Sequence, residues 1–237
     1  MPETWVDHPN VTAIIWANLG GQELGPALVD ILYGDVNPSG RLIYTIAKNV
    51  CDYAQPDVVI EPQPHPQINY TEGVLVDYRS FEANSIEPRF WFGHGLSYSE
   101  FRYSDLQVEV VPSLSEAIEE PINYVADAPG GDSRLYDIAV TVSLNVTNEG
   151  PYDGTEIVQM YLEMPEEAGN PVKVLRGFES LHLRDGDTMP VNIKLTRKDI
   201  SFWDMDQRTW KTPRGESFTV KVGASSADIR ATAQFTL

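Results

Sequence analysis

The feature that most constrains the fold is the series of short alternating segments that fills the chain after Phe101. Apolar and polar residues alternate in 106–110 and in 138–146, which is the pattern of strands with one buried face. Further segments of this kind follow at 156–162, 172–183, 189–195, 218–222 and 231–235. Turn-forming residues such as Asp185 to Asp187 separate them. About seven short strands over ~135 residues predict an antiparallel β-sandwich of the immunoglobulin or fibronectin type III kind.

The first fifty residues have a different pattern, that of α/β structure. Residues 12–17 form a continuous apolar run typical of a buried strand. Residues 22–33 then show apolar residues at helical spacing, with Gly34 in the place of a helix C-cap. Residues 42–46 are expected to form a second strand. This β-α-β stretch is too short to be a domain of its own.

Residues 51–100 are rich in proline and aromatic residues, which predicts an interdomain linker packed over a surface. The densest part, 90–98, could stack sugars or could fill the space between two domains, and we favour the second interpretation. Trp203 and Trp210 are expected to pack within the sandwich or at its edge. Residues 112–132 interrupt the strands and predict an exposed acidic insertion.

The formal charge of -18, from 17 basic and 35 acidic residues, argues against nucleic acid as a partner. It also disfavours an anionic membrane surface. No apolar run approaches the roughly 20 residues of a membrane span, and the first residues lack the pattern of a signal peptide. Cys51 has no second cysteine in the chain with which to form a disulfide. Three Asn-x-Ser/Thr motifs make Asn10, Asn69 and Asn145 candidate N-glycosylation sites.

No set of residues in the chain predicts an active site. Paired carboxylates about 5 Å apart would suit a retaining glycosidase, but an acidic chain offers such pairs by chance, so we expect surface acids. The ones considered are Glu72, Asp77, Glu82, Glu87, Asp204 and Asp206. The four histidines show no metal-binding spacing, and no phosphate loop or nucleophile elbow is present. We therefore expect no catalytic residue, no metal and no cofactor in this chain.

Several motifs nevertheless resemble one family in their order along the chain. Residues 8–16, 21–23 and 28–42, then 71–79 and 88–98, are similar to the late α/β-sandwich region of family 3 glycoside hydrolases. Residues 148–150, 153–154, 158–162 and 175–178 are similar to the fibronectin type III-like domain that follows in that family. The resemblance is greatest to β-glucosidases of fungal type and covers nearly the whole chain.

The resemblance implies an α+β chain with three parts. Residues 1–50 would be the C-terminal piece of an α/β sandwich domain, 51–100 the linker, and 101–237 a fibronectin type III-like β-sandwich. The family implies a secreted enzyme that removes terminal β-glucose from cellobiose and short oligosaccharides by a retaining mechanism. Its Asp nucleophile, from a barrel of about 250 residues, and its Glu acid/base would both lie upstream of this chain. The isolated chain is therefore expected to be inactive, with the upstream barrel and sandwich domains as its partners.

Two other interpretations stay open. The chain could be an independent polysaccharide-binding or scaffold module that uses its aromatic residues to hold glycans. It could also come from a β-xylosidase of the same family, which would share this C-terminal plan. The residues that select the sugar lie outside the motifs found here.

Overall fold

The computed structural model describes residues 4–53, 65, 67, 69–111, 122–123, 131–169 and 172–237. Within these ranges, two α-helices lie in the first half of the chain, α1 (Leu24–Tyr33) and α2 (Tyr78–Ala83). Four short 3-10 helices are η1 (Thr4–Asp7), η2 (Val50–Asp52), η3 (Ser133–Tyr136) and η4 (Glu166–Ala168). The strands are β1 (Phe101–Val110), β2 (Ile122–Asn123), β3 (Ile138–Asn148), β4 (Gly154–Glu163), β5 (Val174–Leu183), β6 (Thr188–Thr196), β7 (Phe202–Asp204), β8 (Thr209–Lys211), β9 (Ser217–Gly223) and β10 (Ile229–Thr236).

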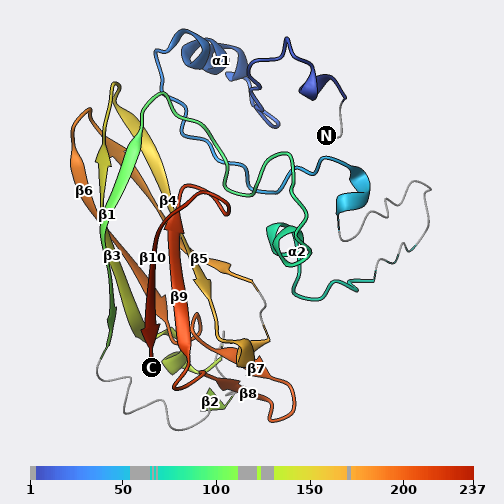
Figure 1. The fold of residues 1–237 in the computed structure, drawn as a ribbon, viewed down its shortest axis with the longest axis vertical. Coiled ribbons are helices and arrows are strands. Elements are labelled where there is room, and N and C mark those ends of the chain that lie inside the picture. Colours follow the sequence, from blue (N-terminus) through green and yellow to red (C-terminus); the bar gives the residue numbers. More distant parts are fainter. Residues whose placement is uncertain are drawn as a thin grey trace.

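Two antiparallel sheets form a sandwich, which Figure 1 shows as the tall part of the molecule. One sheet has the order β1-β3-β6 and the other the order β10-β9-β4-β5. The facing side chains build one apolar core, in which Val140 of β3, Val158 of β4 and Val220 of β9 have no solvent exposure. This core draws only on residues from Phe101 onward. The fibronectin type III-like architecture expected from the alternation is therefore confirmed.

All seven predicted strands are present, with bounds that differ by a few residues. A third small sheet, in the order β2-β8-β7, was not predicted. Its strands have only two or three residues each, which is too short for alternation to be recognised. β2 lies inside the predicted acidic insertion and pairs with Trp210 and Thr209 of β8. Residues 112–121 and 124–130 of that insertion lie outside the described residues, whereas Gly131 and Asp132 at its end are buried and not exposed as predicted.

The predicted strand at 12–17 was wrong. No strand forms there, and Ile14, Ile15 and Trp16 are 37%, 47% and 39% exposed. A strand needs a neighbour to accept and donate its backbone hydrogen bonds, and among the described residues no other segment pairs with the backbone of this run. The apolar composition of 12–17 indicates that the segment tends to be buried, but the described part of the chain contains no strand that covers it.

The prediction of a strand at 42–46 was also wrong. The segment is held to the linker by a single bridge between Ile46 and Phe90 and by hydrogen bonds between the backbones of Leu42 and residues 93–94. The helix prediction was confirmed, with α1 beginning two residues later than expected. Gly34 has φ of 83° and donates its N–H to the Ile31 carbonyl, which is the left-handed C-cap that the sequence indicated.

Residues 69–100, from the predicted linker, cross the β4-β5 face of the sandwich, with α2 beside β5 (Figure 1). Helix α2 was not predicted, because six residues give less than two turns of periodic signal. Prolines 56, 62, 64 and 66 of the predicted linker lie outside the described residues. The linker places the N-terminal segment against one end of the sandwich.

Candidate functional site: the junction between the N-terminal half and the sandwich

The clearest polar site in the chain is a buried ion pair between its two halves. The Arg41 guanidinium donates to the Glu156 carboxylate of β4 at 2.7 Å, and their side chains are 8% and 1% exposed. Arg41 also donates to the carbonyls of Ser39 and Gly40. A buried charge needs both a counter-ion and hydrogen bonds, and the pair supplies both across 115 residues of sequence. The pair therefore fixes where residues 38–42 lie on the sandwich.

Two more residues complete the shell around Glu156. The Tyr103 hydroxyl of β1 donates to its carboxylate at 2.8 Å, and an Arg230 nitrogen of β10 lies 3.5 Å away. The Arg230 guanidinium also lies over the Tyr103 ring, 5.0 Å from the centroid. Burial, reinforced by the neighbouring Glu156 charge, raises the pKa of Tyr103. Tyr103 therefore stays protonated and serves as a permanent hydrogen-bond donor to Glu156.

Asn37, four residues before Arg41, connects three segments with one side chain. Its amide nitrogen donates to the Asp153 carbonyl at 3.1 Å and to the Ser99 hydroxyl at 3.3 Å. Its amide oxygen accepts from the Ser97 hydroxyl and the Tyr98 N–H, each at 2.9 Å. The Asn37 amide thus joins the N-terminal segment, the end of the linker and the loop before β4.

The aromatic linker packs against the sandwich rather than standing free. Tyr78 stacks on Phe92 with ring centroids 4.9 Å apart and meets Tyr161 of β4 edge-on at 5.9 Å. The Tyr78 hydroxyl accepts the N–H of Leu175 in β5 at 2.9 Å, and burial raises the pKa of Tyr78. The geometry agrees with the interpretation of these aromatics as a packed filling between two parts.

Gln159 of β4 connects the linker to the β9–β10 hairpin of the same sheet. Its buried amide donates to the carbonyls of Gly93 and Ala224 at 3.0 and 2.7 Å and accepts from the Tyr161 hydroxyl at 2.6 Å. Gly93 has φ of 79°, and a Cβ there would collide with the Gln159 amide. This close approach requires glycine at position 93.

Most of the carboxylates considered from the sequence have structural partners. Asp77 accepts from the N–H and hydroxyl of Thr45 at 2.8 and 2.7 Å and caps α2, while Asp204 accepts two backbone N–H groups and pairs with Lys211. Glu82 pairs with Lys173 on the sandwich, and Glu87 pairs with Lys48. These contacts explain the acids as structural or surface groups.

The three glycosylation motifs lie at different places. Asn10 and Asn69 are exposed, whereas Asn145 is half-buried on β3 and donates to Asp105 at 3.0 Å. Trp203 and Trp210 form an edge-on pair of half-buried rings between β7 and β8. Within the described ranges, no group of three histidine, cysteine or acidic residues could hold a metal ion, and Cys51 is an exposed free thiol.

The junction residues Asn37, Arg41, Glu156 and Gln159 were not singled out from the sequence. One feature could have pointed to two of them: Glu156 and Gln159 are polar residues within β4, a strand that is otherwise almost wholly buried. Their partners could not be found in this way, because pairing across 60 to 120 residues leaves no local periodicity.

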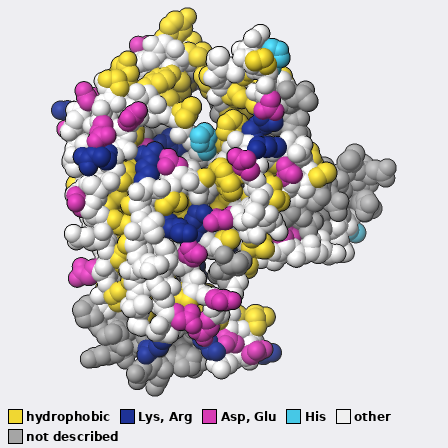
Figure 2. Space-filling view, viewed as in Figure 1, with side chains coloured by type: hydrophobic (Ala, Val, Ile, Leu, Met, Phe, Trp, Pro, Cys, Tyr) yellow, Lys and Arg dark blue, Asp and Glu magenta, His cyan; other side chains and the backbone are white. Residues whose placement is uncertain are grey.

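Helix α1 carries a large exposed apolar surface at the end of the molecule. No residue of α1 is buried, and Val29, Leu32 and Tyr33 are 49%, 59% and 81% exposed. Figure 2 shows hydrophobic side chains gathered at the top of the view, over α1. Contiguous apolar surface of this kind marks an interaction site.

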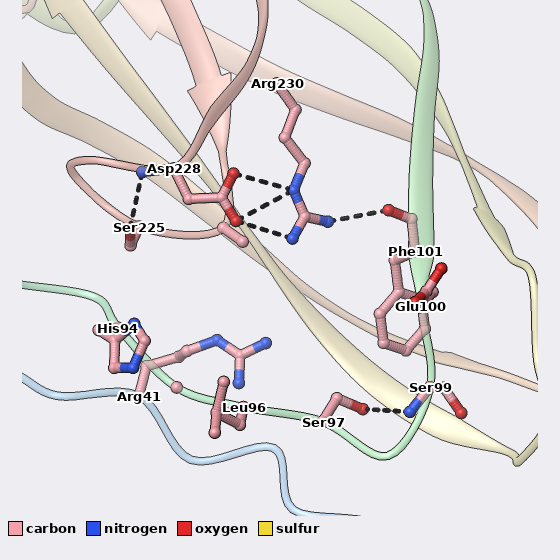
Figure 3. Close-up of a pocket in the computed structure, with 12 residues that line it drawn as sticks. Arg41, His94, Leu96, Ser97, Ser99, Glu100, Phe101, Ser225, Asp228 and Arg230 are labelled. Atoms are coloured by element: carbon pink, nitrogen blue, oxygen red, sulfur yellow. Dashed lines mark hydrogen bonds and ion pairs between the residues drawn. The ribbon is translucent and has the colours of Figure 1, made fainter.

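A pocket of about 400 Å³ opens beside the buried ion pair. Figure 3 shows Asp228 and Arg230 of the β9–β10 hairpin and β10 on one side, and Arg41, His94 and Leu96 on the other. Three segments far apart in the sequence therefore meet around one cavity.

Comparison with known families and proteins agrees with this architecture. Residues 1–98 match the model of the glycosyl hydrolase family 3 C-terminal domain, and residues 156–226 match a fibronectin type III-like domain. The chain is 46% identical over 235 residues to a probable beta-glucosidase D of Aspergillus niger, and 45% identical over 234 residues to a probable beta-glucosidase L of Aspergillus fumigatus. It covers 30% of the length of each, while these alignments include 99% and 98% of the chain itself.

Solved structures give the same result. The beta-D-glucoside glucohydrolase of Trichoderma reesei matches with a TM-score of 0.82 and 40% identity, over 93% of this chain and 30% of that one. A beta-glucosidase of Chaetomium thermophilum matches with a TM-score of 0.84 and 31% identity, over 98% and 36%.

The fold and the junction thus define a fibronectin type III-like sandwich joined to the C-terminal segment of a glycoside hydrolase domain. The chain is similar to the C-terminal part of family 3 glycoside hydrolases, and its similarity to the fungal β-glucosidases extends over nearly its whole length. No helix among the described residues is long and apolar enough to span a bilayer.

Proposed function

We propose that this chain is the C-terminal portion of a secreted β-glucosidase that hydrolyses terminal non-reducing β-D-glucosyl residues of cellobiose and short β-glucans. The observation that carries the proposal is the 46% identity over 99% of the chain to a protein named as a probable β-glucosidase. The intact protein would use a retaining mechanism with two carboxylates.

In this proposal both carboxylates come from parts of the protein that this chain does not include. The structural roles of Asp77, Glu82 and Asp204 support that view, because each of these acids has partners that hold the fold together. The contribution of this chain is then to complete a domain and to brace it, with divisions near residues 50 and 100. Exposed Asn10 and Asn69 are proposed to carry N-linked glycans in the secreted protein.

The exposed apolar face of α1 supports the role in domain completion. Burying apolar surface contributes about 25 cal/mol per Å², so the rest of an α/β sandwich domain would bind side chains such as Val29 and Leu32 favourably. The buried Arg41–Glu156 pair supports the bracing role, because it holds that segment on the sandwich.

A complementation experiment tests the proposal. The chain is co-expressed with the rest of the Aspergillus niger relative, from which the matching region has been deleted, and hydrolysis of aryl β-glucosides and aryl β-xylosides is measured. We expect no hydrolysis by either part alone and preferential β-glucoside hydrolysis by the two together. Leu32→Lys on α1 should lower the recovered activity, whereas Phe178→Lys, at an exposed apolar residue of β5, should not.

Three results would contradict the proposal. Hydrolysis by the chain alone would show that it contains a catalytic site. Preference for the xyloside would assign the chain to a β-xylosidase. Retention of the chain on cellulose, without any complementation, would favour an independent polysaccharide-binding module.

A further inference from the structure

The pocket beside the junction has a lining that suits a particular chemical class of ligand. Its volume of about 400 Å³ falls in the range of about 300–1,000 Å³ that is usual for small-molecule sites. It is walled by the N-terminal segment, the end of the linker, and the β9–β10 hairpin with β10 (Figure 3). The residues that matter for its chemistry are Arg41, His94, Leu96, Glu100, Asp228 and Arg230.

The two arginines of the pocket are already committed to carboxylates. Arg41 donates to Glu156, and Arg230 makes a two-pronged contact with Asp228, with nitrogen–oxygen distances of 2.8 to 3.3 Å. Arg230 also donates to the Phe101 carbonyl at 2.8 Å. Because these positive charges are neutralised by built-in partners, the pocket is not arranged for a free anion.

Other groups around the pocket offer hydrogen bonds that the fold leaves available. The half-buried His94 ring stacks on Phe90 at 5.5 Å, and no intramolecular hydrogen bond to its nitrogens is seen within the described residues. Burial, with a smaller contribution from Arg41, lowers the pKa of His94, which favours the neutral ring with its one donor and one acceptor. The exposed Glu100 carboxylate adds acceptors, while Leu96, 73% exposed, adds an apolar wall.

Donors and acceptors side by side, balanced charge and an apolar wall match the chemistry of a pyranose. Each hydroxyl of such a sugar both donates and accepts, and its C–H groups can lie against an aliphatic side chain. From this geometry we propose that the pocket binds a neutral polyhydroxylated ligand of monosaccharide to disaccharide size, with His94 and Glu100 as the hydrogen-bonding residues. The inference depends only on the lining of the pocket and not on the proposed enzymatic function.

Titration of the full 237-residue chain with D-glucose and with cellobiose, followed by calorimetry and by saturation-transfer NMR, tests the proposal. We expect saturable binding of at least one of the two sugars. His94→Phe keeps a ring stacked on Phe90 and removes both nitrogens, and Glu100→Ala removes the whole carboxylate of an exposed side chain. Each variant should weaken binding about tenfold, the effect of one or two lost hydrogen bonds. His182→Phe, at an exposed histidine of β5 outside the pocket, is the matched control and should bind as the unaltered chain does.

Several outcomes would overturn the proposal. Absence of sugar binding up to about 100 mM would do so, as would equal binding by the unaltered chain and both pocket variants. Tighter binding of inorganic phosphate than of either sugar would make the pocket an anion site instead. Because Glu100 is exposed, its variant gives a folded protein for the comparison even if a change at His94 disturbs the linker.

Discussion

Glu156 is the residue on which most of the junction converges. It accepts hydrogen bonds from Arg41 and Tyr103 and lies near Arg230, yet its side chain is only 1% exposed. Replacement by Gln would keep the shape but leave the buried Arg41 without its counter-ion. We expect Glu156→Gln to lower the free energy of unfolding by about 3 kcal/mol, as measured by urea denaturation.

The matched control for this change is Glu87→Gln. Glu87 also pairs with a basic residue, Lys48, but both side chains are largely in water, at 80% and 46% exposure. Exposed pairs contribute little, so this substitution should leave the urea midpoint nearly unchanged. Equal effects of the two substitutions would show that burial does not set the importance of the pair. The double change Arg41→Met with Glu156→Gln should recover part of the lost stability, because no unpaired charge then remains buried.

His94 gives the junction a dependence on pH. Burial, and to a smaller extent Arg41, lowers the pKa of His94 below its ordinary value of 6.5, while Asp228 acts weakly in the opposite direction. The unfolded chain then binds this proton more readily than the folded one, so the contribution of His94 is full above the ordinary pKa and is lost as the pH falls below it.

We therefore expect His94→Phe to reduce the loss of stability between about pH 7 and pH 5. Urea denaturation at several pH values measures this slope. His182→Phe should leave the slope as it is in the unaltered chain. Parallel pH profiles for all three proteins would contradict the assignment of this dependence to His94.

Among the elements, helix α1 depends on its C-cap more than on packing. It has no buried residue, and Gly34 ends it with φ of 83° and open space around the position of a Cβ. A change there acts through backbone strain alone. We expect Gly34→Val to destabilise the helix by about 1 kcal/mol or more, because β-branched residues tolerate this conformation poorly, and Gly34→Asn to cost much less.

Hydrogen exchange of the α1 amides measures this difference. The Val variant should exchange faster than the unaltered chain in α1 while the strands of the sandwich keep their protection. Equal protection of α1 in the Asn and Val variants would show that the left-handed cap does not limit its stability.

The long strands of the sandwich could be predicted from the sequence, whereas the outcome for the apolar segment at 12–17 could not. β3 and β9 alternate in burial over most of their length, so the alternation in the sequence corresponds directly to the buried and exposed faces of these strands. The apolar run at 12–17 resembled a strand just as closely, yet it has no neighbour within the described chain to pair with. The local hydrophobic pattern indicates only that a segment prefers the extended conformation. Whether it becomes a strand depends on a second segment that pairs with it, and the pattern holds no information about that segment.

At the scale of the whole molecule, the sandwich should be an independent folding unit. Its core contains residues from Phe101 to Phe235 and none from the first half. If that half were removed, Glu156 would keep Tyr103 and Arg230 as partners, and Gln159 would keep Ala224 and Tyr161. They would therefore not be left buried without partners.

We expect a chain of residues 101–237 to unfold cooperatively in urea, with a free energy of unfolding about 1.5–3 kcal/mol below that of the same region in the full chain, since Tyr161 would become exposed. Near-ultraviolet circular dichroism distinguishes fixed packing from a loosely packed state. Loss of that signal, with retained secondary structure, would show that the first half is needed for the packing of the core.

The sequence by itself determined the β-sandwich, the position of α1 with its glycine cap, and the family that the chain resembles. These features are local or ordered along the chain: alternation with period two, apolar spacing on one helix face, and motifs in a fixed succession. The motifs at 28–42 and 158–162 were recognised separately, and nothing in either showed that Arg41 and Gln159 serve the same junction.

Only the tertiary structure decided which polar residues meet. Arg41 reaches Glu156 across 115 residues, and Asn37 reaches Asp153 across 116. The aromatic linker packs against the sandwich because the Tyr78 ring meets Tyr161 edge-on and its hydroxyl accepts the N–H of Leu175. A contact between distant segments depends on how complete sheets and loops pack together. No single segment carries that information, and so the junction and its pocket could be found only once the chain was folded.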